Sequence, residues 1–161
     1  MIIIVEGPDG AGKTTRINQL LDAHPGSSYK HFSNPKTSQE ADDYWKVYTE
    51  AVKASDPNKV TIFDRSWYSD RVYGPIIRGH MEMLYQHVEM LEALVYRYGG
   101  GYVIYCTAPT HLLWKRCQER GETFVLSKEK LEAIRESYEL VMKNDCKLPV
   151  MRIDTSAKWY A

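Results

Sequence analysis

Short apolar runs alternate with longer segments of helical periodicity along the chain. Residues 2–5 form a continuous β-branched run, typical of a strand buried on both faces, and residues from about 13 to 22 carry apolar positions at helical spacing. The alternation predicts an α/β fold with a five-stranded, mainly parallel sheet flanked by helices, whose ligands bind at the carboxyl ends of the strands. The four later strands are expected at residues 28–32, 60–63, 102–106 and 150–153.

Helices are expected in the intervals between these strands. Thr37 with Glu40 three residues later has the form of a capping box, and Thr110 and Ser127 are expected to cap the helices that follow them. We expect residues 65–79 to form a loop. The predicted helices span residues 38–54, 81–98, 110–120 and 127–143.

Composition narrows the class of protein. The chain of 161 residues fits a single domain covering 1–161, and 43% hydrophobic with 26% charged residues is typical of a globular protein. Because 21 basic residues balance 21 acidic ones, the charge favours a small-molecule partner over nucleic acid, although a local basic cleft is compatible with a neutral chain.

The apolar runs are far shorter than the roughly 20 residues that span a bilayer, so we expect no membrane segment. Three cysteines without CxxC spacing and no signal peptide favour a cytoplasmic protein.

The sequence GPDGAGKT at residues 7–14 lies between the first predicted strand and the first predicted helix. It matches the pattern G-x-x-x-x-G-K-S/T, in which glycines let backbone N–H groups turn toward phosphate oxygens at a helix N-terminus. Lys13 is expected to reach the β- and γ-phosphates of ATP, and the Thr14 hydroxyl to bind Mg²⁺. The expected nucleotide-binding residues are Gly7, Asp9, Gly10, Ala11, Gly12, Lys13, Thr14 and Thr15. A guanine-reading Asn-Lys-x-Asp segment, as a GTPase requires, is missing from the sequence.

Asp64 and Arg65 follow the third predicted strand directly, at the sheet edge where the phosphates are expected. A carboxylate there can hold Mg²⁺ through water, and an arginine can bridge two phosphoryl groups during transfer. A salt-bridged loop is the alternative interpretation of the pair.

Two segments resemble bacterial thymidylate kinases: EGPDGAGKTT at residues 6–15 and DRSWYSDRVYG at residues 64–74. The resemblance extends over nearly the whole chain and implies a P-loop kinase with a three-layer fold. It implies that Asp9 lies beside the acceptor sugar, that Arg65 contacts phosphate, and that Tyr73 crowds the 2′ position to favour deoxyribose. Ser69 falls in register with the same family motif and is taken as a substrate-side residue.

The resemblance also covers YVIYCTAPTHLLWKRCQERGE, which is similar to the family's strand, turn and R-x-x-x-R-G helix. It implies that Arg116 and Arg120 flank a short lid over ATP near residues 120–128, and that residues 153–156 form an adenine-side loop. Because the lid segment GETFVLSKEK contains no arginine, the catalytic charge is expected from Arg116, Arg120, Arg71 or Arg78. In thymidylate kinases a helix corresponding to residues 81–98 contributes to a dimer interface. Both a homodimer and simple packing of this helix on the sheet stay open.

The segment after the second predicted strand departs from that family. Ser33-Asn34-Pro35 stands where thymidylate kinases carry Arg-Glu-Pro, whose arginine binds the acceptor phosphate. Ser66 instead fits the E-R-S segment of deoxynucleoside kinases, but Asn34 occupies the place of their general base. Trp45, with Tyr44 and Tyr48, is a candidate to stack on the acceptor base, with core packing as the alternative.

The sequence therefore predicts ATP- and Mg²⁺-dependent phosphoryl transfer to a deoxynucleoside monophosphate, a small nucleotide acceptor. Two alternatives within enzymes are a deoxynucleoside kinase and a kinase of a hydroxyl on a modified base or nucleic-acid end. The alternative outside catalysis is an ATP-dependent binding module.

Overall fold

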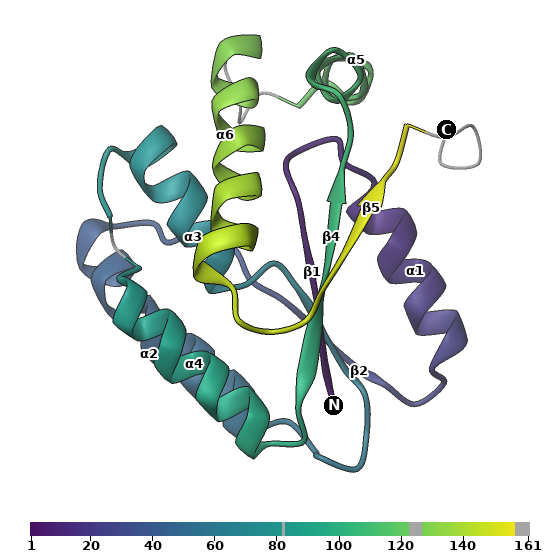
Figure 1. Ribbon diagram of the computed structural model, residues 1–161, viewed down its shortest axis with the longest axis vertical. Coiled ribbons are helices and arrows are strands. Elements are labelled where there is room, and N and C mark those ends of the chain that lie inside the picture. The colour runs from purple at the N-terminus through teal and green to yellow at the C-terminus, as the bar shows by residue number, and fades with distance from the viewer. Residues whose placement is uncertain (82, 123–126, 157–161) are drawn as a thin grey trace.

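A sheet of five parallel strands forms the centre of the computed structural model, which describes residues 1–81, 83–122 and 127–156 (Figure 1). The strand order is β2-β3-β1-β4-β5, and every neighbouring pair is parallel. The predicted α/β class and parallel sheet are confirmed. The strands are β1 (Ile2–Glu6), β2 (Ser28–His31), β3 (Thr61–Asp64), β4 (Gly101–Thr107) and β5 (Val150–Asp154).

The central strand explains the β-branched run at the start of the chain. Ile2, Ile3, Ile4 and Val5 are fully buried because β1 is flanked by β3 and β4 and covered on both faces. Its carboxyl end therefore opens at the middle of the sheet edge, where parallel α/β folds bind their ligands.

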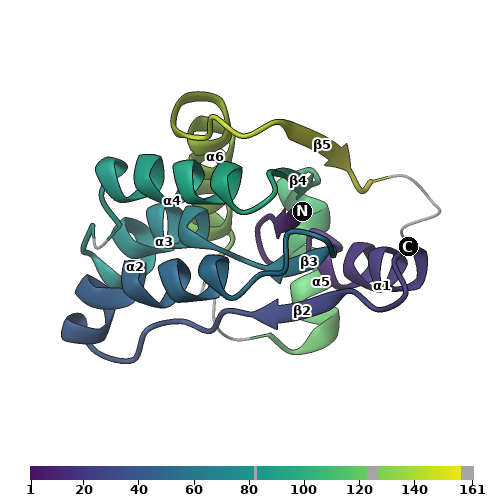
Figure 2. The ribbon, with the colours of Figure 1, turned by 90° about the horizontal axis from the view of Figure 1, so that it is seen from below.

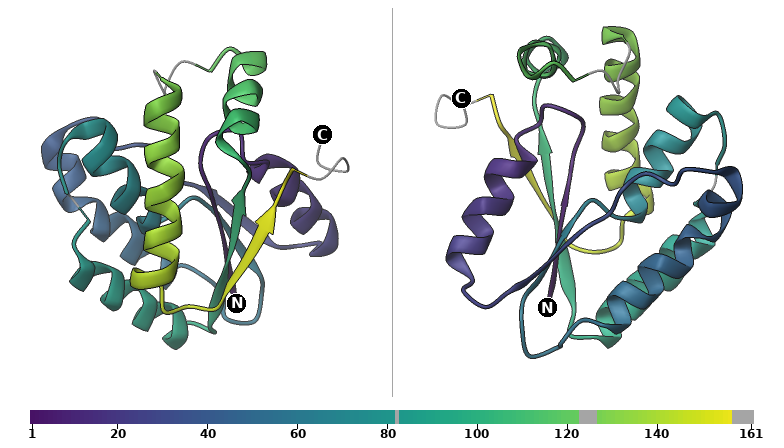
Figure 3. Two further views of the ribbon diagram at one scale, coloured as in Figure 1. Left: turned by 45° about the horizontal axis from the view of Figure 1, so that its top comes forward. Right: turned by 180° about the vertical axis from the view of Figure 1, so that it is seen from behind.

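Helices cover both faces of the sheet and complete the three predicted layers. Figure 2 shows α2, α3, α4 and α6 on one face and α1 on the other, and the view from behind in Figure 3 shows α1 well apart from α2 and α4. The helices are α1 (Lys13–Ala23), α2 (Ser38–Lys53), α3 (Trp67–Tyr73), α4 (Tyr85–Arg97), α5 (Thr110–Arg120) and α6 (Lys128–Leu140), with π-helical turns η1 (Gly74–Arg78) and η2 (Val141–Asp145).

The prediction of a loop over residues 65–79 was wrong, because α3 and η1 occupy most of that segment. Ser66 caps α3 by accepting a hydrogen bond from the Tyr68 backbone N–H at 3.3 Å. Six of the seven residues of α3 are buried, so the helix lacks the polar face that makes a helical period visible in a sequence. The serine cap was the available signal.

The predicted helix boundaries needed three corrections. The helix predicted from residue 81 begins at Tyr85, because Leu84 has extended backbone angles, and the helix predicted to residue 143 ends at Leu140 before η2. Thr110 is the first residue of α5 and not its cap; Pro109 holds that position, and the Thr110 hydroxyl donates to Glu132 in α6.

The other two caps are confirmed. The Glu40 backbone N–H donates to the Thr37 hydroxyl at 3.1 Å, and the Lys130 N–H donates to Ser127 at the same distance. The predicted lid near 120–128 falls partly on residues 123–126, which lie outside the described residues. No described helix combines the length and the apolar character needed to cross a bilayer.

Candidate active site

The glycine-rich loop connects the carboxyl end of β1 to the start of α1. Gly7 has φ 148°, and a Cβ there would lie 2.2 Å from the Cys106 carbonyl oxygen; at Gly10, with φ 80°, it would lie 2.7 Å from the Leu113 carbonyl oxygen. Gly12 has φ 86° and forms the N-terminal boundary of α1. The loop therefore requires glycine at these positions, and such a backbone lets N–H groups turn toward a bound phosphate chain.

Lys13 reaches back across the loop. Its Nζ donates to the carbonyl oxygens of Gly7 at 2.9 Å and Pro8 at 3.0 Å. Burial, together with the nearby positive charge of Arg65, lowers the pKa of Lys13 to about 8. Thr14 and Thr15, the next two residues of α1, are exposed.

This pKa predicts a pH dependence for nucleotide binding. Because Lys13 is an ammonium below about pH 8 and a neutral amine above it, we expect kcat/KM for the donor nucleotide to fall above about pH 8. Steady-state kinetics across pH measures this. In Lys13→Arg the fall should move to higher pH, because a guanidinium stays protonated. A wild-type profile that stays flat to about pH 9.5 would contradict the prediction.

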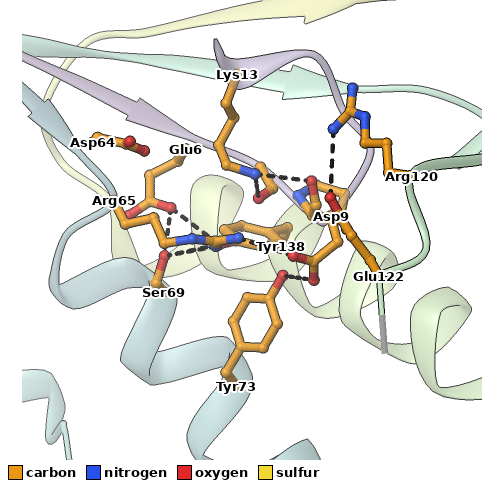
Figure 4. Close-up of polar contacts among 12 residues, drawn as sticks. Glu6, Asp9, Lys13, Asp64, Arg65, Ser69, Tyr73, Arg120, Glu122 and Tyr138 are labelled. Carbon is orange, nitrogen blue, oxygen red and sulfur yellow. Dashed lines mark hydrogen bonds and ion pairs between the residues drawn. The ribbon is translucent and has the colours of Figure 1, made fainter. Parts of the chain in front are cut away.

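Arg65 extends from the end of β3 to Asp9 in the glycine loop. Among the described residues it is the single non-glycine with a positive φ, 68°, and its backbone N–H donates to the Val5 carbonyl at 3.1 Å. Its guanidinium donates to Asp9 Oδ1 at 3.2 Å and lies 5.1 Å from the centre of the Tyr73 ring (Figure 4). An uncommon backbone conformation anchored in this way is typical of functional sites.

Asp9 joins two elements far apart in sequence. Its Oδ2 accepts a hydrogen bond from the Tyr73 hydroxyl at 2.7 Å, while Oδ1 accepts from Arg65. The structure thus brings together the three residues that the resemblance assigned to the acceptor side. Their contacts with an acceptor stay a prediction.

A buried carboxylate that the sequence analysis missed lies behind Arg65. Glu6, at the end of β1, accepts hydrogen bonds from the hydroxyls of Ser66 and Ser69 at 2.7 Å each and from Tyr138 at 3.0 Å. Burial raises its pKa, against the lowering effect of Arg65 and the three hydroxyls. Its signal in the sequence was an acidic residue ending a fully apolar strand.

Asp64 lies at the other end of the site. Its Oδ2 accepts from the Tyr29 hydroxyl at 2.7 Å and lies 3.0 Å from His31 Nδ1, both on β2. Asp64 and Thr14 line one pocket of about 180 Å³. Carboxylate and hydroxyl oxygens are ligands that Mg²⁺ accepts, so the residues present fit a metal bound together with phosphate. Within the described residues, no three His, Cys, Asp or Glu side chains form a metal cluster of their own.

The two arginines of α5 occupy different places. Arg116 donates to the Gly10 carbonyl at 3.1 Å and to the side chain and carbonyl of Thr155 at 2.9 and 2.6 Å. Arg116 thus ties the loop to the residue after β5. Arg120 is exposed, lies 3.6 Å from Glu122 and lines the same pocket as the glycine loop. Of the two, Arg120 is the one that faces the pocket.

The three aromatic residues of α2 that were candidates for base stacking lie in different surroundings. Trp45 stacks on His87 with ring centres 5.4 Å apart, and its contact with an acceptor base stays a prediction. Tyr44 and Tyr48 are buried in the core, where their hydroxyls donate to the Ser33 carbonyl and to Asp70. Tyr44 and Tyr48 therefore pack in the core, which was the alternative interpretation of these residues.

A glycine loop of this form on the central strand of a parallel sheet is the P-loop of a nucleotide-binding α/β fold. The profile of the Polyphosphate kinase 2 (PPK2) family matches residues 1–133, and the chain belongs to that family. It is therefore an enzyme of the nucleotide-kinase type that transfers phosphoryl groups. The narrower resemblance to thymidylate kinases stays a prediction. No curated protein matches the chain.

Solved structures share the fold. The YorR protein of Bacillus subtilis, in complex with phosphorylated GDP, superposes with a TM-score of 0.78 at 22% identity, over 96% of this chain and 85% of YorR. Deoxyadenosine kinase from M. mycoides with bound dATP gives 0.59 at 20% identity, over 96% and 91%. The same enzyme with dCMP and dCDP as products gives 0.57 at 18% identity, over 96% and 90%.

Proposed function

We propose that the protein transfers the γ-phosphoryl group of ATP, with Mg²⁺, to the 5′-phosphate of a deoxynucleoside monophosphate. The observation that carries this proposal is the cluster of Asp9, Arg65 and Tyr73 beside the glycine loop. A nucleotide hydrolase or switch has no need of an acceptor side, whereas a kinase must hold a second substrate against the first.

The donor side has its own residues. The loop backbone and Lys13 would hold the β- and γ-phosphates, while Thr14 and Asp64 would hold the metal directly or through water. Bound Mg²⁺ would supply neutralising charge to the phosphates. Arg120, which lines the same pocket, would add positive charge there.

On the acceptor side, Arg65 would turn its Nη2 from Asp9 to a phosphate, and no other arginine lies between Arg16 and Arg65 in the chain. An oxygen of the acceptor phosphate forms a bond to the γ-phosphorus as the bond to ADP breaks. The Asp9 carboxylate is a hydrogen-bond acceptor for a sugar hydroxyl. Tyr73, fixed by its bond to Asp9, would crowd the 2′ position of the sugar.

The solved structures bear on the acceptor in two ways. The enzyme named deoxyadenosine kinase was solved with dCMP and dCDP as products, so a monophosphate is a product there, and its name supports a deoxynucleoside as an alternative acceptor. YorR was solved with phosphorylated GDP, which supports a nucleotide as the acceptor. The family name supports a second candidate, in which inorganic polyphosphate replaces ATP as the donor.

The proposal is tested with a donor and acceptor panel. Purified protein with Mg²⁺ and either ATP or inorganic polyphosphate is incubated with each deoxynucleoside monophosphate, each ribonucleotide and each deoxynucleoside, and products are separated by chromatography. We expect diphosphate formation from one or more deoxynucleoside monophosphates with ATP. Turnover with polyphosphate alone would select the second candidate. Acceptor-independent loss of ATP, or turnover of nucleosides alone, would contradict the proposed acceptor.

Tyr73 provides a test of sugar selection. Replacing it with alanine should lower the preference for deoxyribonucleotides over ribonucleotides by roughly tenfold or more in kcat/KM, because the ring no longer excludes a 2′-hydroxyl. Tyr73→Phe is the matched control: it loses the bond to Asp9 but keeps the ring, so the preference should persist. Equal preferences in both variants would show that the ring does not select the sugar.

A further inference from the structure

The guanidinium of Arg65 lies between two carboxylates that hold it in different ways. Asp9 contacts it directly, at 3.2 Å, and the Asp9 side chain is 16% exposed. Glu6 is fully buried and reaches it only through two hydroxyls, those of Ser69 and Tyr138 (Figure 4). Asp9 thus contacts the guanidinium from the side that faces the glycine loop, whereas Glu6 lies on the opposite, buried side of it.

The direction of the hydrogen bonds follows from the chemistry of the groups. Ionised Glu6 accepts only, so the Ser69 hydroxyl donates its proton to Oε2 at 2.7 Å, and the Tyr138 hydroxyl, 3.0 Å from the same Oε2 and 2.9 Å from Ser69 Oγ, shares its proton between these two acceptors. Each hydroxyl oxygen then has only lone pairs left to offer. Arg65 Nη1 donates to both of them, at 3.4 Å to Ser69 and 3.3 Å to Tyr138.

We propose that Glu6 is a positioning residue for phosphoryl transfer, which holds Arg65 in place through the hydroxyls of Ser69 and Tyr138. This inference rests on the proposed function. Because Glu6 keeps Nη1 fixed from behind, Nη2 is able to exchange its bond with Asp9 for a bond to an acceptor phosphate while the guanidinium keeps its orientation. The backbone of Arg65 has a left-handed conformation, and its N–H donates to the carbonyl of Val5, the residue before Glu6. These two features fix the Cα from which the Arg65 side chain extends.

The position requires a carboxylate. Glutamine has the same size but lacks the charge, and one of its two terminal atoms donates where Glu6 accepts on both. The neutral side chain would leave Arg65 without a counter-charge behind it, and one of the three hydroxyls would have to reverse its hydrogen bond. We therefore expect Glu6→Gln to lower kcat by about 10- to 100-fold, the cost of a misplaced catalytic group.

The chain offers a matched control in Glu92. This carboxylate is also buried, accepts from the Tyr68 hydroxyl at 2.6 Å and from the Lys147 N–H at 3.0 Å, and has a pKa raised by burial. Glu92→Gln makes the same chemical change between α4 and η2, away from the site. We expect both variants to lower the melting temperature and only Glu6→Gln to lower kcat.

A double-mutant cycle separates positioning from general damage. In an Arg65→Lys background, Glu6→Gln should change kcat by no more than about twofold, because the group that Glu6 positions is already gone. Equal fold-losses in both backgrounds, or a Glu6→Gln enzyme with wild-type kcat, would overturn the proposal. Where Glu6→Gln fails to fold, Tyr138→Phe is compared with Tyr68→Phe in the same cycle.

A measurement without substrate keeps this proposal distinct from the proposed function. The guanidinium N–H resonances of Arg65, assigned by their loss in Arg65→Lys, should be sharp and slow to exchange in wild type and Glu92→Gln, and broadened in Glu6→Gln. Sharp resonances in Glu6→Gln would overturn the positioning role. A wild-type protein inactive toward all monophosphates would contradict the proposed function and leave this result standing.

Discussion

Replacing Lys13 with methionine is expected to lower kcat by about 10²- to 10³-fold, the usual effect of removing a single charged donor from a transition state. Phosphoryl transfer depends on positive charge held at the β- and γ-phosphates, and Lys13 is the cation that crosses the glycine loop. Its two carbonyl contacts lie on the loop itself, so little of the fold depends on it. Product formation under saturating donor and acceptor measures the effect.

The control for this variant is Lys53→Met, on the exposed end of α2, where the lysine lies 4.0 Å from Glu50. That variant should keep kcat near wild type. Thermal unfolding of Lys53→Met should differ from wild type by only a few degrees, in line with about 0.5 kcal/mol or less for an exposed position. A Lys13→Met enzyme with near-normal turnover would rule out the P-loop as the donor site.

Replacing Gly7 with alanine should destabilise the protein by about 3 kcal/mol or more. The added Cβ would lie 2.2 Å from the Cys106 carbonyl oxygen, at the carboxyl end of β1 and β4, at a φ of 148° that is nearly closed to other residues. Both the β1 end and the β4 backbone would have to move apart. Urea unfolding monitored by circular dichroism gives the free energy.

Gly26→Ala is the matched control for Gly7. Gly26 also has a positive φ, 82°, but nothing lies within 4 Å of an added Cβ. The loss of stability in Gly26→Ala therefore measures only the cost of a left-handed backbone conformation for alanine, about 1 kcal/mol. Similar losses in the two variants would show that the contact with Cys106 does not determine the cost at Gly7.

Much of the fold could be predicted because its signals are local. The β-branched run of β1 and the glycine pattern after it both lie within residues 2–14. The strand, the loop and the start of the helix could therefore be predicted from residues that are neighbours in the sequence. The α3 helix was missed for the opposite reason: burial on nearly every side removes the polar face that marks a helix.

The residues of the candidate site could likewise be predicted only where a local motif contains them. Asp9, Arg65 and Tyr73 belong to two motifs that the sequence displays, and the structure brings them into contact. Glu6 and Tyr138 are separated by 132 positions, and no pattern in the chain links them. Such pairs depend on how α6 packs on the sheet, which is a property of the whole fold.

The contacts of Thr155 have a consequence for the order in which the enzyme matures during its synthesis. The glycine loop is synthesised before β5, yet Thr155, 144 positions after Ala11, donates to the Ala11 carbonyl, and Arg116 links Thr155 to Gly10. Until translation reaches β5, the nascent loop has none of these supports. The loop therefore acquires its supporting contacts only after the last strand of the sheet has been made, so we expect the capacity to bind a nucleotide to arise after β5 and not with the loop itself.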